Sequence, residues 1–181
     1  MTNIPEKESL KIESYASQVP EIGSWLGALQ DTRHRTMREL QGVSQTVVDW
    51  LPPGGESGIG AVLYHIAGIE ADWLYVEVLE QPMSTEVAAL FPYDIRDGQG
   101  HLSQVLGISL EQHLSRLEIV RGWLMEVYQQ MNLTEFRRAR SLPQYDVTPE
   151  WVLHHLMQHE AEHRSQIGAL RKRAESELGL K

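Results

Sequence analysis

Four amphipathic segments, separated by runs of proline and glycine, constrain the fold of this chain most strongly. Their apolar residues recur every three or four positions, which is the spacing of one face of an α-helix. We predict helices over residues 20–40, 58–79 and 148–176, and a further one that starts near 101 or 109 and ends at 131. The pattern predicts an all-α protein built as a four-helix bundle.

Capping residues and helix breakers define the ends of these segments. Pro20 suits a first helical turn, Ser109 is a candidate cap, and Thr148 followed by Pro149 is typical of a helix start. Residues 81–100 and 133–147 are expected to be irregular, and only 46–50 resembles a strand. We predict one bundle domain over residues 20–176, with an N-terminal extension over 1–19 and a tail over 177–181.

Charge and cysteine content exclude several classes of function. The net charge of −9 argues against nucleic acid as a partner, because phosphate binding needs clustered positive charge. The chain has no cysteine, so disulfides and cysteine-bound zinc are excluded, and any thiol chemistry needs an external thiol. The acidic start is no secretory signal, and the longest apolar stretch, 59–69, is too short to span a bilayer. We therefore expect a soluble, cytoplasmic protein without a membrane or nucleic-acid partner.

The sequence His159-Glu160-Ala161-Glu162-His163 is the strongest candidate for chemistry. Histidines four residues apart on a helix point the same way, at a separation that one metal ion can bridge. The stretch matches the H-E-x-x-H pattern of zinc proteases and the reversed H-x-x-E-H pattern as well. It predicts a metal site, and the alternative is a pair of core histidines that bond to neighbouring side chains.

The helical positions of this stretch argue against a protease. At about 100° per residue, His159 and His163 fall in or beside the apolar stripe, so both imidazoles are expected to point into the bundle. Glu160 and Glu162 fall off the stripe and are expected on the solvated surface, whereas a protease needs its glutamate beside the metal. No further ligand is available after His163, so a third ligand has to come from upstream.

His65 and Glu70 are the upstream candidates. His65 is the better ligand type, although the same angular count places it near the edge of its apolar stripe. Glu70 falls closer to the centre of the same apolar stripe, where a buried carboxylate needs a partner. Glu70 could be a ligand, an acceptor for an imidazole N–H, or a member of a buried ion pair. The other histidines have no such paired spacing or lie off the stripe: His34, His101, His113, His154 and His155.

Taken together, these residues resemble the DinB superfamily, also described as DinB/YfiT-like metalloenzymes. His65-Ile66-Ala67 followed by Glu70 is similar to the family's H-x-A-x-x-E signature. The stretch from His159-Glu160 through His163-Arg164 to Gln166-Ile167 is similar to its closing H-E-x-x-H-R-x-Q-I helix. The connector Trp50-Leu51-Pro52 also fits, and the resemblance covers roughly residues 20–175.

The resemblance implies a four-helix bundle with a three-histidine site for one divalent metal, zinc or nickel. Carried over position by position, the ligands are His65, His159 and His163. Characterised members of the family include transferases and isomerases that use low-molecular-weight thiols such as bacillithiol or mycothiol, and members often pair as homodimers. For this chain the resemblance therefore implies a small-molecule substrate, a thiol as possible co-substrate, and a homodimer.

Three imidazoles with an open fourth position are typical of a catalytic metal site. Such a metal activates a thiol or a water molecule, so a thiol transferase or isomerase is the leading hypothesis. A metal-dependent hydrolase and a non-catalytic metal-binding module remain as alternatives. Arg137, Arg138 and Arg140 lie near the start of the last helix and are either binders of a cofactor carboxylate or a solvated basic loop.

Overall fold

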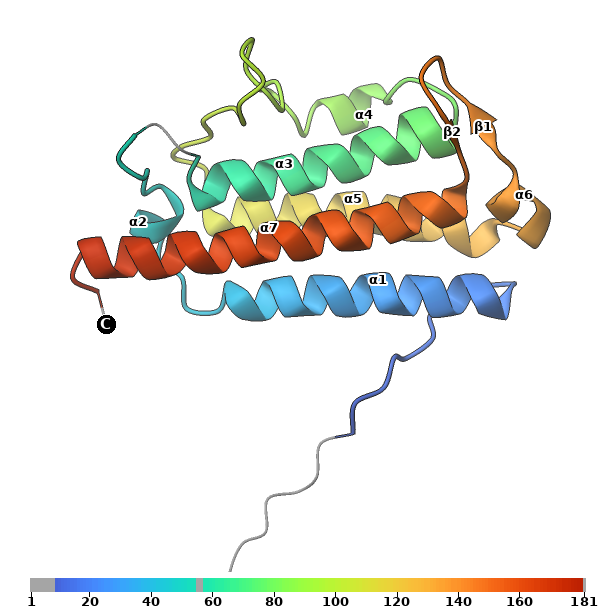
Figure 1. The fold of residues 1–181 in the computed structure, drawn as a ribbon, viewed down its shortest axis with the longest axis horizontal. Helices are drawn as coiled ribbons and strands as arrows, with labels where there is room; N and C mark the ends of the chain where they lie inside the picture. The colour runs from blue at the N-terminus through green and yellow to red at the C-terminus, as the bar shows by residue number, and fades with distance from the viewer. Residues whose placement is uncertain (1–8, 55–56, 181) are drawn as a thin grey trace, which may run out of the picture.

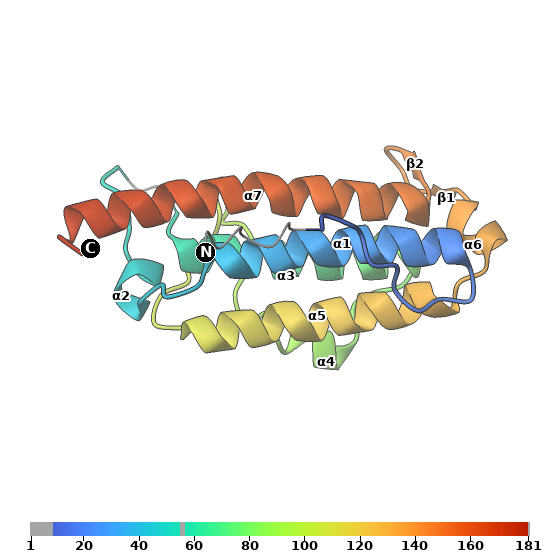
Figure 2. The ribbon, with the colours of Figure 1, turned by 90° about the horizontal axis from the view of Figure 1, so that it is seen from below.

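Four long helices lie side by side in a computed structural model of the chain, which describes residues 9–54 and 57–180 (Figure 1). The helices are α1 (Pro20–Glu39), α3 (Ile59–Asp72), α5 (Leu110–Gln130) and α7 (Pro149–Glu177). α1 and α7 run in one direction and α3 and α5 in the other. α7 and α5 each contact both α1 and α3, so α1 lies diagonally opposite α3 (Figure 2). The prediction of an all-α protein is confirmed.

The predicted caps fix the helix ends. The Ser109 side chain accepts a hydrogen bond from the backbone N–H of Gln112, whose own side chain accepts one from the backbone of Ser109. The Thr148 hydroxyl accepts a hydrogen bond from the backbone N–H of Trp151, and Pro149 occupies the first helical position. Each cap satisfies donors that the first helical turn leaves unpaired. The helix starts predicted at residues 20, 109 and 148 therefore hold.

Several short elements differ from the prediction. The expected strand over 46–50 is instead a single helical turn, α2 (Gln45–Val48), because a helical turn buries Val47 and Val48 against α3 without needing a paired strand. The segment expected to be one helix to residue 79 changes after α3 into a π-helix, η1 (Trp73–Val78). The irregular segments contain α4 (Thr85–Ala88), α6 (Leu133–Arg137) and an antiparallel pair, β1 (Arg140–Ser141) with β2 (Asp146–Val147).

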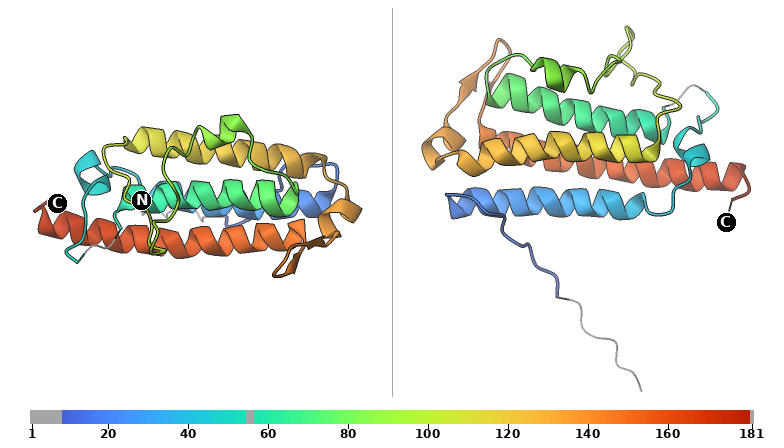
Figure 3. Two further views of the ribbon diagram at one scale, coloured as in Figure 1. Left: turned by 90° about the horizontal axis from the view of Figure 1, so that it is seen from above. Right: turned by 180° about the vertical axis from the view of Figure 1, so that it is seen from behind.

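The segment between η1 and α5 covers the outer side of α3 and α5, as the two views in Figure 3 show. The Tyr64 hydroxyl bonds to both the N–H and the C=O of Tyr93, and Arg116 donates to the C=O of Leu90. Within residues 9–54 and 57–180, no helix is long and apolar enough to cross a membrane.

Most of the apolar core forms two clusters, one toward each end of the bundle, and a small third cluster contains Ala71, Val87 and Val120. One cluster is built around Ile22, Leu26, Leu29, Leu74, Leu124, Tyr128, Val152 and Leu156. The other is built around Leu40, Ile59, Val62, Leu63, Ile66, Leu117, Ile167 and Leu170. In every long helix, a short middle stretch separates the residues of the two clusters. That middle layer holds one buried charged side chain from each long helix.

Four buried charges fill the middle layer, one from each long helix. We call them the ion quartet: Arg33 of α1, Glu70 of α3, Arg121 of α5 and Glu160 of α7. None is more than 4% exposed. Because two positive and two negative groups meet, the quartet is neutral as a whole. A buried charge is tolerated only when it is paired and hydrogen-bonded in this way.

Every side-chain nitrogen of the two arginines has an acceptor. Arg33 donates to Glu160 and Glu70 at 2.8 Å each and to the C=O of Leu117 at 2.9 Å. Arg121 donates to the two oxygens of Glu70 at 2.6 and 2.9 Å and to Glu160 at 2.9 Å. Its remaining nitrogen donates to the C=O of Leu29 at 3.2 Å. These bonds, of which those from Arg121 to Glu70 are bidentate, fix the lengthwise register of the helices that carry them.

The expectation that Glu160 lies on the solvated surface is therefore wrong. Glu160 is 1% exposed, whereas Glu162 is exposed as expected. The reason is that α7 packs against both α1 and α3, so its buried arc is wider than the apolar stripe alone indicates. Burial by itself would raise the pKa of Glu160, but Arg33 and Arg121 outweigh it and lower this pKa to about 2.

Replacing Glu160 by Gln should destabilise the fold strongly, because it leaves the two guanidiniums undercompensated in the core. We expect a loss of about 3–5 kcal/mol in the free energy of unfolding, measured by urea denaturation at neutral pH. Glu162→Gln on the same helix is the matched control and should stay within about 0.5 kcal/mol of the wild type.

The same comparison has a defined pH dependence. A carboxyl whose pKa is lowered on folding contributes stability above its unfolded pKa and loses that contribution as the pH falls through its folded pKa. The difference between wild type and Glu160→Gln should therefore narrow as the pH falls from 5 toward 2. A difference that stays constant over this range would contradict the assigned role of Glu160.

Candidate metal centre

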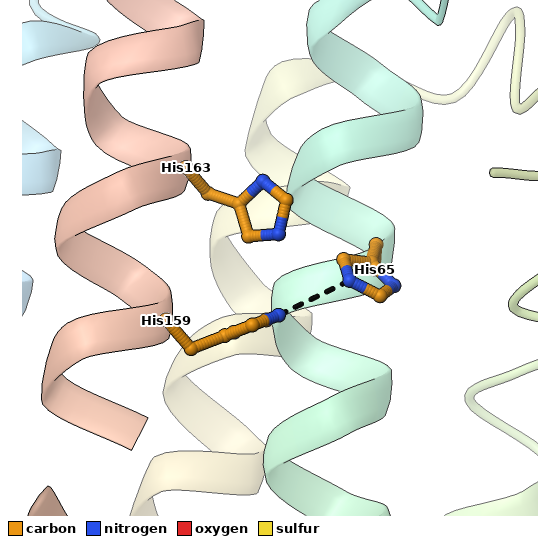
Figure 4. Close-up of side chains that lie close together, drawn as sticks. All are labelled: His65, His159 and His163. Atoms are coloured by element: carbon orange, nitrogen blue, oxygen red, sulfur yellow. Dashed lines mark hydrogen bonds between the residues drawn. The ribbon is translucent and has the colours of Figure 1, made fainter. Parts of the chain in front are cut away.

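Three imidazoles meet between α3 and α7 (Figure 4). His65 comes from α3, and His159 and His163 come from α7, where their four-residue spacing places them on one face. The Nε2 atoms of His65 and His159 are 3.1 Å apart, and one nitrogen from each of the three rings lies within 4.8 Å of the others. The ring centroids are 4.5–5.0 Å apart.

These separations fit a single metal ion. Two imidazole nitrogens bound to one tetrahedral zinc at about 2.0–2.1 Å lie roughly 3.3 Å apart. The Nε2 atoms of His65 and His159, 3.1 Å apart, already have about this spacing. The 4.8 Å limit for the three ligand nitrogens exceeds it by roughly one bond length. No carboxylate joins the cluster within the described ranges, so the donor set is nitrogen only. Zinc and nickel both accept such a set.

Burial keeps two of the rings in the state that binds metal. Desolvation lowers the pKa of His65 to about 4, with smaller contributions from His163 and Arg96. Desolvation also lowers the pKa of His159 to about 3, helped by His163, His65 and His155. Both rings are therefore neutral near pH 7 and carry a lone pair. His65 Nδ1 is buried and has no hydrogen-bond partner among the described residues.

Gln166 orients the third ring. Its side-chain oxygen lies 2.9 Å from Nδ1 of His163 and accepts a hydrogen bond from it. A proton on Nδ1 leaves the lone pair on Nε2, the other ring nitrogen. An outer acceptor of this kind also makes the ring a stronger ligand.

The cluster lies at the edge of the bundle. His65 is 1% exposed, whereas His159 and His163 are half-buried, with their rings directed toward His65 of α3 (Figure 4). Glu160, which directly follows His159 on α7, is the residue of this stretch that is fully buried in the core. One side of the cluster therefore remains accessible, which is what a site that exchanges ligands requires.

The family model of the DinB superfamily matches residues 28–167. The chain belongs to the DinB superfamily. The match contains all three histidines and all four members of the ion quartet. No curated protein matches the sequence.

The structure of this DinB-superfamily chain also resolves the role of Glu70. Of the three roles left open by the sequence, it takes that of a buried ion-pair member, bound to both arginines of the quartet. Arg33 and Arg121 were not predicted. They could have been found, because each occupies an apolar position of its helical stripe. These stripes are Leu26, Leu29, Arg33 and the C-cap residue Leu40 for α1, and Leu114, Leu117, Arg121 and Leu124 for α5.

The arginines before α7 do not form an open anion site. Arg138 pairs with Glu80 and Glu135, and Arg137 lies within 3.6 Å of Glu21 and Glu150. Arg140 is 3% exposed and donates to three backbone carbonyls, so the description as a solvated loop fails for this residue. These bonds hold β1 against η1 and α6.

The remaining histidines lie apart from the cluster or at its border. Of the five histidines outside the cluster, His34, His101 and His154 are exposed. His113 is buried on α5, with Nδ1 at 3.3 Å from Arg116. His155 is half-buried and its ring centroid is 6.0 Å from that of His159.

Replacing His65 by Ala should lower zinc affinity by more than about a hundredfold, because loss of an acceptor behind a ligand alone costs 10–100-fold. The measurement is a competition titration with a coloured zinc chelator. His113→Ala removes a histidine that is equally buried but does not belong to the cluster, and the zinc affinity of this variant should equal that of the wild type.

Gln166→Leu should give an intermediate result, about 10–100-fold weaker binding, because the ligand stays but loses its fixed orientation. The same chelator titration ranks all the variants. Unchanged affinity in His65→Ala would show that the zinc lies elsewhere.

Proposed function

We propose that this chain is a metal-dependent enzyme in which His65, His159 and His163 hold one divalent cation, zinc or nickel, to activate a low-molecular-weight thiol for transfer or isomerisation. The observation that carries the proposal is the convergence of three imidazole nitrogens, without a carboxylate, at an accessible edge of the bundle. When bound, such a cation acts as a Lewis acid that makes a coordinated thiol or water nucleophilic near neutral pH.

The chain's own residues supply the conditions for this chemistry. His65 and His159 stay unprotonated because they are desolvated, so protons do not compete for their lone pairs near neutral pH. Gln166 sets the tautomer of His163. A site made only of neutral ligands leaves the full positive charge of the cation to stabilise an incoming thiolate.

A thiol rather than water is favoured as the nucleophile for two reasons. Glu70 and Glu160 are bound to arginines in the core, so neither can act as the general base that a hydrolase of the zinc-protease type places beside its water. A thiol needs less help, because it is far more acidic than water. Since the chain has no cysteine, that thiol is a separate molecule.

Cobalt substitution tests the proposal directly. Protein loaded with one equivalent of Co²⁺ is titrated with cysteine, with glutathione, and with serine as the oxygen counterpart of cysteine. We expect a sulfur-to-cobalt charge-transfer band with at least one thiol and none with serine. The band should be lost in His159→Ala and kept in His154→Ala, which removes an exposed histidine of the same helix.

A cobalt spectrum that no thiol perturbs would contradict thiol activation. If the zinc-loaded protein then cleaves simple esters, and His159→Ala does not, a hydrolase replaces the proposal. If neither reaction occurs, the remaining function is metal binding without catalysis.

A further inference from the structure

A cavity of about 540 Å³ opens beside the first turn of α7, where η1 and β2 approach it. Three aromatic side chains dominate its walls: Trp73 of η1, Tyr145 of the β1–β2 connection, and Trp151 of α7. Its volume lies within the range of about 300–1,000 Å³ that is usual for sites of small molecules. No sequence pattern singles out these residues, because they come from three separate segments.

The aromatic rings contact one another and the ring of His155, whose centroid lies 4.4 Å from that of Trp73 and 5.1 Å from that of Trp151. The rings of Trp73 and Tyr145 are nearly parallel, at 18°, with centroids 6.2 Å apart. Trp151 lies 5.4 Å from Trp73 at 36°. Tyr145 and Trp151 remain 42% and 48% exposed, a large fraction for side chains of this size. Aromatic side chains that stay this exposed beside a cavity are typical of a ligand site.

The charges around the cavity are negative. No Lys, Arg or His is among the described residues that line it, whereas Asp146 is. Behind the wall, Glu77 accepts a hydrogen bond from the Tyr145 hydroxyl at 2.8 Å. The second oxygen of Glu77 is buried and has no partner among the described residues, and Glu77 as a whole is 5% exposed. Burial raises the pKa of Glu77, and that of Asp72 as well.

These features together select one class of ligand. The negative faces of aromatic rings attract cations, and the carboxylate of Asp146 adds to this attraction while it repels anions. A metal ion is a poor occupant, because the walls are mostly apolar and offer no converging nitrogen or oxygen ligands. A large, weakly hydrated organic cation satisfies both the apolar walls and the negative charge.

We propose that this cavity binds the alkylated ammonium group of a small molecule. The position of the cavity relative to the histidine cluster indicates how long that molecule is. Trp151, His155, His159 and His163 lie four residues apart on one face of α7, with ring centroids 5.1 Å apart for the first pair and 6.0 Å for the second. Two helical turns, about 11 Å, therefore separate the cavity from the cluster.

A small molecule can span that distance. The ammonium group in the cavity is then one end of the substrate, and its reacting atom lies at the histidine cluster. This second step rests on the function proposed above, whereas binding of the ammonium group does not.

The test uses two probes of the same shape and different charge. Choline and its neutral counterpart 3,3-dimethylbutan-1-ol are titrated into the full chain, and binding is followed by tryptophan fluorescence and calorimetry. We expect choline to bind at least about tenfold more tightly, because the cation–π attraction acts on choline alone. Equal affinity of the two probes would overturn the proposal, and so would the absence of choline binding.

Two substitutions locate the site. Trp151→Leu keeps an apolar side chain but removes the ring, and Tyr145→Leu does the same at the other exposed aromatic residue of the lining. Each should weaken choline binding at least about tenfold with unchanged helix content by circular dichroism. Tyr15→Leu is the control, because Tyr15 has the same 42% exposure as Tyr145 and lies outside the cavity. Choline binding that survives Trp151→Leu and Tyr145→Leu would overturn the assignment to this cavity.

Two further outcomes separate this proposal from others. His159→Ala should bind choline like the wild type, so a failure of the metal proposal leaves this result unchanged. If choline does not bind, and Trp151→Leu instead changes the sedimentation of the protein, the aromatic walls serve an interface with a second copy of the chain.

Discussion

The buried ion quartet is the interaction on which the rest of this structure depends. It takes one charged side chain from each of the four long helices, and each arginine also bonds to a carbonyl on another helix. Apolar contacts alone tolerate sliding of one helix along another, because leucine and isoleucine pack in many registers. A planar guanidinium between two carboxylates does not tolerate such sliding. A small shift breaks several charge-assisted hydrogen bonds, and the buried interior has no water to replace them.

The position of the quartet explains the position of the histidine cluster. Glu70 follows His65 by five residues on α3, and Glu160 directly follows His159 on α7. Once both carboxylates meet the same two arginines, α3 and α7 have a fixed register, and His65 comes to face His159 and His163. The glutamate inside the His-Glu-x-x-His stretch is therefore a structural residue here, although its spacing matches that of a catalytic one.

Much of the fold could be predicted from the sequence, because the caps and the helical periodicity are local. Ser109, Thr148 and Pro149 mark helix starts through their own hydrogen bonds or geometry, so the structure reproduces them. The burial of Glu160 could not be predicted from periodicity, since it depends on two arginines from other helices. The π-helical turn of η1 and the helical turn of α2 likewise depend on what packs against them.

The same distinction applies to the candidate site. The pairing of His159 with His163 follows from spacing along one helix, and the family motif added His65. The outer partner Gln166 lies three residues from His163, yet the sequence alone does not show which ring nitrogen it meets. The aromatic cavity was missed because Trp73, Tyr145 and Trp151 come together only through the folded arrangement of η1, the β1–β2 connection and α7.

The central claim is that one register of α3 and α7 brings three imidazoles to a single metal ion. X-ray absorption at the zinc edge, on the full chain with one equivalent of zinc, tests this claim most directly. The account predicts three imidazole ligands with nitrogen at about 2.0–2.1 Å, together with one non-protein light atom. A shell made only of oxygen, or one with fewer than two imidazoles, would contradict it.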